Sequence, residues 1–312
     1  MNRYLPEGNL IGTRENREYV SSLSGLERAM AEGRILEGMA VSCDKELNIT
    51  VDLYGIKGII PKNEALYADG GPKDIAVITR VGKAVAFKVI GFEADGAGRK
   101  VAVLSRRAAQ AECMQRFITS LTEGDVIDAR VTHLEQFGAF VDVGCGVVSL
   151  LCIDCISVSR ISHPKIRFCV GMPIKAVVKS IDRETGRLYV THKELLGTWR
   201  ENAERFHVGQ TVSGVVRSIE DYGVFIELTP NLAGLGEVVE GVNVGDTVAV
   251  YIKNIIPERM KIKLVIIDVC KTEPQRPSFE YFIGDAEHID RWVYSPAESS
   301  RTVETVFSEE KE

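Results

Sequence analysis

The chain has 312 residues, of which 45% are hydrophobic and 26% charged, with 38 Lys+Arg against 44 Asp+Glu and a net charge of −6. This is the composition of a globular protein with two or three domains. An evenly spread negative charge would exclude most nucleic-acid binders, because phosphates attract Lys and Arg. No apolar run reaches the roughly 18 residues of a membrane helix, and the polar first twenty residues carry no signal-peptide core. The 7 cysteines, an odd number, favour a reducing compartment. We therefore expect a cytoplasmic chain without membrane contact.

The first 35 residues are the first predicted element. Apolar residues recur at helical spacing between Tyr19 and Met30. We expect residues 1–35 to form a helical N-terminal segment.

The rest of the chain carries an internal repeat. A glycine precedes an alternating strand at Gly38, Gly124 and Gly209, with spacings of 86 and 85 residues. Each unit contains a second glycine-led strand and closes on a basic strand, as in RKVAVLSRR, GRLYVTHKE and MKIKLVIID. About five short strands per unit, each with one aliphatic face, predict a mainly β chain of small closed barrels. The predicted barrels cover residues 36–108, 120–197 and 205–271, the third with a shortened middle connection.

Short helices are predicted at the joints and beyond the last repeat. Cys113 and Phe117 follow Ala109 at every fourth residue, and Ala203 and Phe206 follow Trp199 at helical spacing. The segment 272–312 is acidic and aromatic. Its apolar stripes, Phe279 with Phe282 and Ile283 and then Ile289 with Trp292 and Val293, predict two short helices. These helices would cover the third barrel, or would bind a partner.

The three units resemble the RNA-binding repeat of bacterial ribosomal protein S1, a five-stranded oligonucleotide-binding (OB) barrel. FGAFVDV (137–143) and YGVFIEL (222–228) are similar to the aromatic-Gly-x-Phe-Val/Ile strand of that family. IDRETGRLYVTHKE (181–194) and AVLSRR (102–107) are similar to its closing strand. The resemblance implies three tandem OB barrels that bind single-stranded RNA. It implies mRNA in translation, at or near the small ribosomal subunit, as a monomer within a ribonucleoprotein.

Outward aromatic side chains are the candidate base-stacking groups. Phe140 has the opposite parity to its aliphatic neighbours, and Phe137 precedes Gly138, whose freedom permits a bend that brings both rings to one surface. Tyr222 and Phe225 occupy the same two positions in the third repeat. A base stacked on an aromatic ring contributes ~1–3 kcal/mol without sequence preference. The alternative is that these rings cap a barrel end or pack on a linker helix.

The closing strands supply candidate contacts to the RNA backbone. Arg187 and Tyr189 share one parity in the second repeat, as do Lys261 and Lys263 in the third. By resemblance, Arg187, Lys261 and Lys100 fill a basic RNA-contact position, and Asp182 fills an acidic one. The alternative is an ordinary solvated strand face. The complete set of candidate RNA-binding residues is Phe137, Phe140, Asp182, Arg187, Tyr189, Tyr222, Phe225, Lys261 and Lys263.

The first repeat departs from the family. Leu47 and Thr50 occupy its two aromatic positions, so its stacking platform is missing. The histidine of the family's Gly-Leu-x-His turn is replaced in every repeat, by Pro61, Cys152 and Glu237. A barrel without stacking residues is expected to dock on protein or on another barrel, and the resemblance implies the ribosome or its proteins. Loss of function in this repeat fits equally well.

Other functions receive little support from the residues. Cys152 and Cys155 form a CxxC near Cys145 and Cys169, which leaves a local metal or redox role open. A strand between Cys145 and Cys152 would separate them too far for one four-thiolate site, so buried small hydrophobic residues are the simpler interpretation. No phosphate-binding loop or HExxH is present. We expect no catalysis, no metal and no cofactor. A non-catalytic protein-interaction scaffold, or a translation regulator whose barrels bind protein, remains the alternative.

The negative charge is unevenly distributed. Residues 272–312 hold 10 acidic and 4 basic residues, whereas the barrel segments are close to neutral. Neutral barrels permit RNA binding that depends more on stacking than on charge. The acidic extension could compete with RNA, in which case its deletion would tighten binding.

Overall fold

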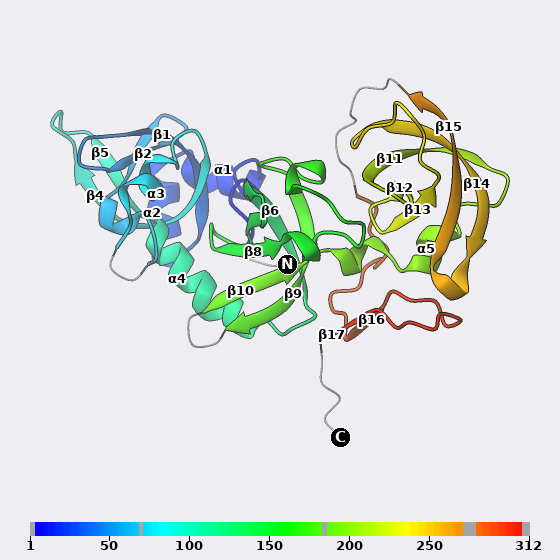
Figure 1. The fold of residues 1–312 in the computed structure, drawn as a ribbon. Coiled ribbons are helices and arrows are strands. Elements are labelled where there is room, and N and C mark those ends of the chain that lie inside the picture. The colour runs from blue at the N-terminus through cyan, green and yellow to red at the C-terminus, as the bar shows by residue number, and fades with distance from the viewer. Residues whose placement is uncertain (1–3, 69–70, 183–185, 271–278, 308–312) are drawn as a thin grey trace.

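The computed structural model describes residues 4–68, 71–182, 186–270 and 279–307. Within these ranges the chain folds into three closed five-stranded barrels in sequence order, followed by a two-stranded sheet (Figure 1). The predicted class, a mainly β chain of tandem OB-type barrels joined by short helices, is confirmed. Among the described helices none is both long and apolar enough to span a bilayer.

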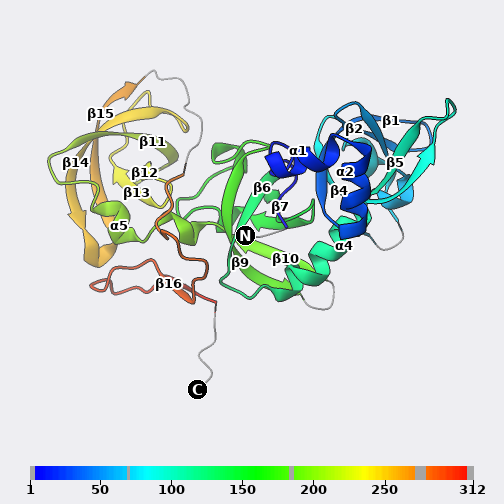
Figure 2. The same cartoon turned by 180° about the vertical axis from the view of Figure 1, so that it is seen from behind.

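The first barrel has the strand order β1-β2-β3-β5-β4. Its strands are β1 (Leu36–Cys43), β2 (Ile49–Leu53), β3 (Ile56–Ile60), β4 (Ala84–Ala94) and β5 (Lys100–Ser105). The helices α1 (Arg14–Val20) and α2 (Leu23–Glu32) precede it, and the short helix α3 (Asp74–Ile78) lies between β3 and β4. Helix α2 begins where the Ser22 hydroxyl accepts the Gly25 N–H and ends at Gly33, whose φ of 61° suits glycine. Both N-terminal helices lie against the first barrel (Figure 2).

The second and third barrels repeat this topology after helical joints. Helix α4 (Arg106–Arg116) leads into the second barrel and α5 (Trp199–Ala203) into the third. The second barrel consists of β6 (Val126–Glu135), β7 (Gly138–Asp142), β8 (Val148–Cys152), β9 (Pro173–Asp182) and β10 (Arg187–Thr191). The third consists of β11 (Thr211–Glu220), β12 (Gly223–Thr229), β13 (Leu232–Gly236), β14 (Thr247–Ile256) and β15 (Lys261–Cys270). Single 3₁₀ turns lie at Lys62–Glu64, Ile118–Ser120, Ile153–Cys155, Pro164–Ile166, Lys193–Leu196 and Pro257–Arg259.

A bulge at one place in the first strand of every barrel fixes the alignment of the three repeats. The pairing register shifts just after Ala40, Val131 and Val216, which are therefore equivalent positions. Such bulges bend a strand and help a small sheet to close. This alignment makes Gly38 equivalent to Gly214. The sequence-based match of Gly38 with Gly124 and Gly209 is therefore wrong by five residues.

Close packing explains why glycine occupies these two strand positions. A Cβ atom at Gly38 would lie 2.6 Å from Cγ1 of Val51, and one at Gly214 would lie 2.5 Å from Cγ2 of Ile226. Both distances are shorter than side-chain packing allows. The first strand of these barrels thus crosses the second too closely for any side chain.

Two buried ion-pair networks tie the barrels to one another. Arg106 of α4 binds Glu7 through both its Nε (2.6 Å) and its Nη2 (3.1 Å), and both side chains are less than a tenth exposed. Arg167, from the connection between β8 and β9, donates to Glu227 of β12 at 2.8 Å, and Arg217 of β11 donates to the same carboxylate. Two-pronged Arg–carboxylate contacts fix geometry as well as charge. We infer that they set the relative placement of neighbouring barrels.

The C-terminal extension differs from the prediction of two short helices. Its described residues, 279–307, contain no helix but form a two-stranded antiparallel sheet of β16 (Arg291–Val293) and β17 (Glu304–Val306). The backbone hydrogen bonds of this segment go to other elements instead: Phe282 N–H donates to Leu195 O, and Ile289 N–H donates to Gly124 O. Residues 272–278 and 308–312 lie outside the described residues.

A buried carboxyl group joins the N-terminal segment to the first barrel and gives a testable pH dependence. Glu37 is 1% exposed, and its Oε2 accepts the backbone N–H groups of Leu10 (2.9 Å) and Ile11 (2.8 Å). Burial raises the pKa of Glu37 to about 7.

Because the folded-state pKa lies above the unfolded one, the folded state holds the proton more tightly, and this group's contribution to stability is lost as pH rises from about 4.5 to 7. We expect the wild type to lose roughly 3 kcal/mol relative to Glu37→Gln between pH 4.5 and 8. Urea unfolding of both proteins at the two pH values measures this difference. Parallel pH profiles would contradict it.

Candidate nucleic-acid interface

The four predicted aromatic residues form two matching pairs on the second and third barrels. Phe137 and Phe140 lie with ring centroids 6.0 Å apart and planes at 90°. Tyr222 and Phe225 repeat this edge-to-face geometry at 6.1 Å and 90°. Phe137 is 56% exposed and Tyr222 71% exposed, whereas the second ring of each pair is half-buried. One ring of each pair is therefore anchored and the other presents its face to solvent.

The backbone register extends each pair into a row of side chains across neighbouring strands. In the second barrel, Phe140 of β7 pairs with Leu150 of β8, which pairs with Tyr189 of β10. Phe140 also pairs with His133 of β6, and the two rings lie 6.2 Å apart. Residues paired across adjacent strands point to the same face of a sheet. Tyr189 thus lies on the same surface as Phe140, and His133 is an addition that the sequence analysis missed.

The third barrel has the same row with one change of chemistry. Phe225 of β12 pairs with Leu235 of β13, which pairs with Lys263 of β15. Lys263 is therefore the counterpart of Tyr189, and Lys261 the counterpart of Arg187, two residues earlier on the closing strand. Both lysines are exposed. The second barrel thus offers the ring of Tyr189 where the third offers the cation of Lys263.

The two charged candidates of the second barrel face each other at the edge of the row. Arg187 of β10 and Asp182 of β9 are cross-strand partners, and both are exposed. The carboxylate lowers the net positive charge there. A phosphate would meet an arginine beside an acidic neighbour, not an isolated cation.

The first barrel lacks the row. Its register places Thr50, Ile59 and Val103 where the second barrel has Phe140, Leu150 and Tyr189. The counterpart of Arg187 is the buried Val101, so the expected equivalence of Lys100 is wrong by one residue. Lys100 instead forms an ion pair with Glu27 of α2.

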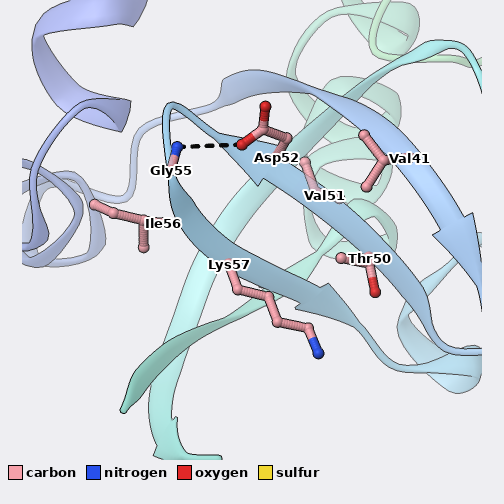
Figure 3. A pocket seen from close by; sticks show the side chains of 7 residues that line it. All are labelled: Val41, Thr50, Val51, Asp52, Gly55, Ile56 and Lys57. Carbon is pink, nitrogen blue, oxygen red and sulfur yellow. Dashed lines mark hydrogen bonds between the residues drawn. The ribbon is translucent and has the colours of Figure 1, made fainter.

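In place of aromatic rings, the outer surface of the first barrel has a hollow of about 260 Å³ (Figure 3). It is lined by Val41, Thr50, Val51, Asp52, Gly55, Ile56 and Lys57. Val41 at its edge is 48% exposed, and Gly55 N–H donates to Asp52 at its tip. This surface carries aliphatic side chains, together with the exposed Asp52 and Lys57, where the other barrels carry rings.

The cysteines lie in different surroundings. Cys145 is buried next to Cys113 of α4, while Cys169 is exposed. Cys155 is buried, and the ammonium of Lys179 lies 3.3 Å from its sulfur. Within the part of the chain that the structure describes, no three His, Cys, Asp or Glu side chains gather in a way that could hold a metal ion.

Residues 120–193, which contain all five strands of the second barrel, match the model of the S1 RNA binding domain. The small ribosomal subunit protein bS1 of Staphylococcus aureus (strain COL) is 32% identical over 238 residues, or 75% of this chain. The bS1 protein of Leuconostoc lactis is 26% identical over 96% of this chain and 73% of its own length. The resemblance to the S1 family is confirmed.

The chain spans part of the length of these S1 relatives. The aligned part covers 58% of the Staphylococcus aureus protein. A crystal structure of a multidomain protein with nucleic acid binding domains from Streptococcus pneumoniae is 13% identical over 76% of this chain and 74% of that chain. The two structures superpose with a TM-score of 0.25.

Proposed function

We propose that this chain binds single-stranded RNA, and specifically mRNA at or near the small ribosomal subunit in the cytoplasm. The observation that carries the proposal is the pair of edge-to-face rings at the same place on two barrels. Exposed ring faces accept bases of any identity, because every base has a π-face. The match to the S1 RNA binding domain over the second barrel supports the same conclusion.

In this proposal the second and third barrels carry the contacts and the chain acts as a monomer. Bases stack on Phe137, Phe140, Tyr222 and Phe225, with Tyr189 as a further ring. The backbone follows the closing strands, where Arg187, Lys261 and Lys263 meet phosphates and Asp182 limits the charge.

The first barrel is proposed to dock on protein, namely the ribosome or ribosomal proteins. Thr50 and Val103 replace the rings of the row, and Val41 leaves an aliphatic surface beside a hollow. Apolar surface of this kind suits protein contact better than phosphate contact. Protein docking is thereby assigned to the first barrel alone. The alternative, a protein-binding scaffold, would require all three barrels to dock on protein.

Salt dependence of RNA affinity tests the proposal. Titration of an unstructured single strand at several salt concentrations should give a log K against log[salt] slope that is negative, with about −0.7 for each phosphate contacted. The triple variant Arg187→Gln, Lys261→Gln and Lys263→Gln should reduce the slope by about 2. An unchanged slope would remove these three residues from the interface, and no binding even at low salt would favour the scaffold.

A further inference from the structure

A pocket of about 250 Å³ lies between the first two barrels, outside the aromatic rows. It is formed by the N-terminal segment, the β3–β4 connection and β6. Three cations line it: Arg80, Lys83 and Arg130. Pockets that collect like charges are costly unless a counter-charge occupies them.

Arg130 is held in position by the protein, but its Nε donor is unused within the part of the chain that the structure describes. Its Nη1 donates to Gly171 O at 2.8 Å, and its Nη2 donates to the Asn9 side chain. Its Nε is buried and has no hydrogen-bond partner among the described residues, and the same is true of Nε of Arg80. A buried N–H without a partner costs free energy, which a bound acceptor would recover.

The two carboxylates at the pocket are already engaged. Glu7 is paired with Arg106 on the side facing α4 and lies 3.6 Å from Arg80. Asp142 accepts the backbone N–H groups of Glu7 (2.7 Å), Gly144 (2.8 Å) and Gly146 (3.0 Å). Four cations, Arg106 included, therefore face two carboxylates. The pocket has an excess of positive charge.

The pKa of Lys83 agrees with this description. It is lowered by burial and then by repulsion from Arg80, with a smaller opposing effect from Glu7. An anion in the pocket would offset that repulsion.

From this arrangement we propose that the pocket binds a phosphoryl group through Arg80, Lys83 and Arg130. The expected source is a backbone phosphate of the bound RNA, and that source rests on the proposed function. Three guanidinium or ammonium groups around one small cavity are the usual chemistry for a phosphate, whose oxygens accept charge-assisted hydrogen bonds.

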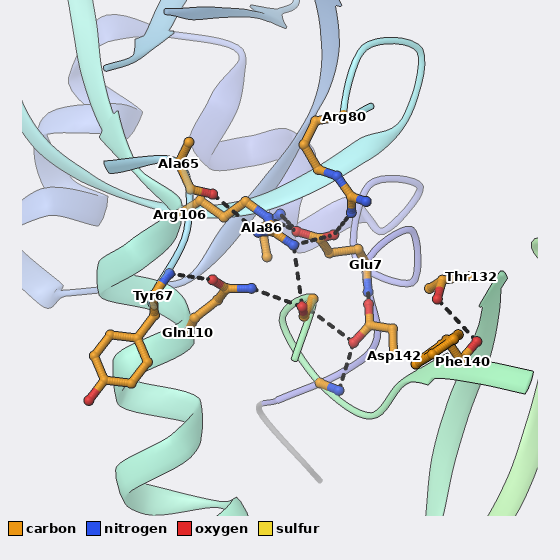
Figure 4. Close-up of polar contacts among 12 residues, drawn as sticks. Glu7, Ala65, Tyr67, Arg80, Ala86, Arg106, Gln110, Thr132, Phe140 and Asp142 are labelled. Carbon is orange, nitrogen blue, oxygen red and sulfur yellow. Dashed lines mark hydrogen bonds and ion pairs between the residues drawn. The ribbon is translucent and has the colours of Figure 1, made fainter. Parts of the chain in front are cut away.

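The position of the pocket favours RNA as the source. Thr132, which lines the pocket, donates its hydroxyl to Phe140 O at 3.0 Å, and Phe140 belongs to the stacking row of the second barrel. Figure 4 shows Thr132 and Phe140 beside Asp142, below the Glu7 and Arg80 side chains. A strand whose base stacks on Phe140 could continue across Thr132 into the pocket. The first barrel would then hold backbone through Arg80 and Lys83 although it lacks stacking residues.

The first arm of the test measures RNA affinity in Lys83→Gln and Arg130→Gln. We expect each to weaken binding of a single strand by about tenfold near 0.1 M salt and to reduce the salt slope by about 0.7. Arg130→Lys keeps the charge but loses the Nε donor and the planar fork, so its RNA affinity should lie between those of the wild type and Arg130→Gln. Lys45→Gln is the matched control, because Lys45 is exposed at the β1–β2 turn, away from the pocket. Melting temperatures of all variants show whether they fold.

The second arm titrates inorganic phosphate and pyrophosphate into RNA-free protein and follows the arginine Nε–Hε NMR signals. A downfield shift of the Arg130 signal, identified by its loss in Arg130→Lys, supports the phosphoryl site even if the chain binds no RNA. Pyrophosphate binding together with unchanged RNA affinity in both variants would overturn the RNA source and leave a free phosphate compound as the ligand. No shift, together with wild-type RNA affinity in folded variants, would overturn the site itself.

Discussion

Replacing Phe137, Phe140, Tyr222 and Phe225 together by alanine is expected to lower the affinity for single-stranded RNA by more than 100-fold. Each base–ring contact contributes ~1–3 kcal/mol, so even partial loss at two barrels exceeds the effect of removing single charges. The expectation depends on the exposed ring faces of the two pairs, since a ring that merely capped a barrel end would be buried. Fluorescence anisotropy with a labelled single strand measures the change.

The design separates stacking from damage to the fold. Phe137→Ala and Tyr222→Ala alter the most exposed ring of each pair and should leave stability almost unchanged. Tyr54→Ala is the matched control, because Tyr54 is 53% exposed on the first barrel, outside the row. Equal affinity of the fourfold variant and the wild type would refute the aromatic interface. If replacing the aromatic pair of only one barrel lowers the RNA affinity, the interface lies on that barrel.

The repeat was predictable from the sequence because its strands alternate and its glycines recur. Ala139, Val141 and Val143 are all buried while Phe140 between them is not, as their parity requires. The alignment of the first repeat was less accurate, because a glycine before a strand and a glycine within a strand look alike in sequence. Gly38 serves close packing against Val51, and only the bulge register reveals this.

Side chains brought together by pairing across strands were harder to foresee. His133 reaches Phe140 because a bulge in β6 shifts the register by one residue, and no sequence pattern in β6 signals that bulge. The pocket between barrels combines Arg80 and Arg130 from positions 50 residues apart, with Glu7 from the N-terminal segment. Such contacts depend on how one barrel sits on the next, which local periodicity does not encode.

The extension was misassigned because its apolar spacing fits two patterns. Phe279, Phe282 and Ile283 have helical spacing, but Trp292 and Tyr294 are both buried while Arg291 and Val293 are not, which is strand alternation. Tertiary packing selects the strand, because Trp292 and Tyr294 pack into the core of the third barrel. The shortened connection between β13 and β14 leaves that barrel in need of additional cover.

The extension's contacts reverse the expectation for its deletion. Trp199 N–H donates to Tyr294 O, and the Tyr294 hydroxyl donates to Asn231 O. On the second barrel's side, Val126 N–H donates to Glu287 O. The described extension therefore joins these two barrels through contacts that do not involve the aromatic pairs. Deleting the extension should therefore destabilise the third barrel and weaken RNA binding. If the extension instead competed with RNA, its deletion would tighten binding.

Trp292→Ala is the sharpest form of this prediction. Trp292 is 7% exposed in the third core, so truncation should destabilise that barrel by ~3–5 kcal/mol. Its indole Nε1 has no partner among the described residues, so Trp292→Phe loses no hydrogen bond and should cost much less. Because the chain has 2 tryptophans, Trp199 in the same core is the sole remaining tryptophan in both variants and reports urea unfolding by its fluorescence. Val293→Ala, on the exposed face of β16, is the control. If Trp292→Ala unfolds at the same urea concentration as Trp292→Phe, the extension is not part of the barrel's core and competition with RNA becomes the better account of its acidity.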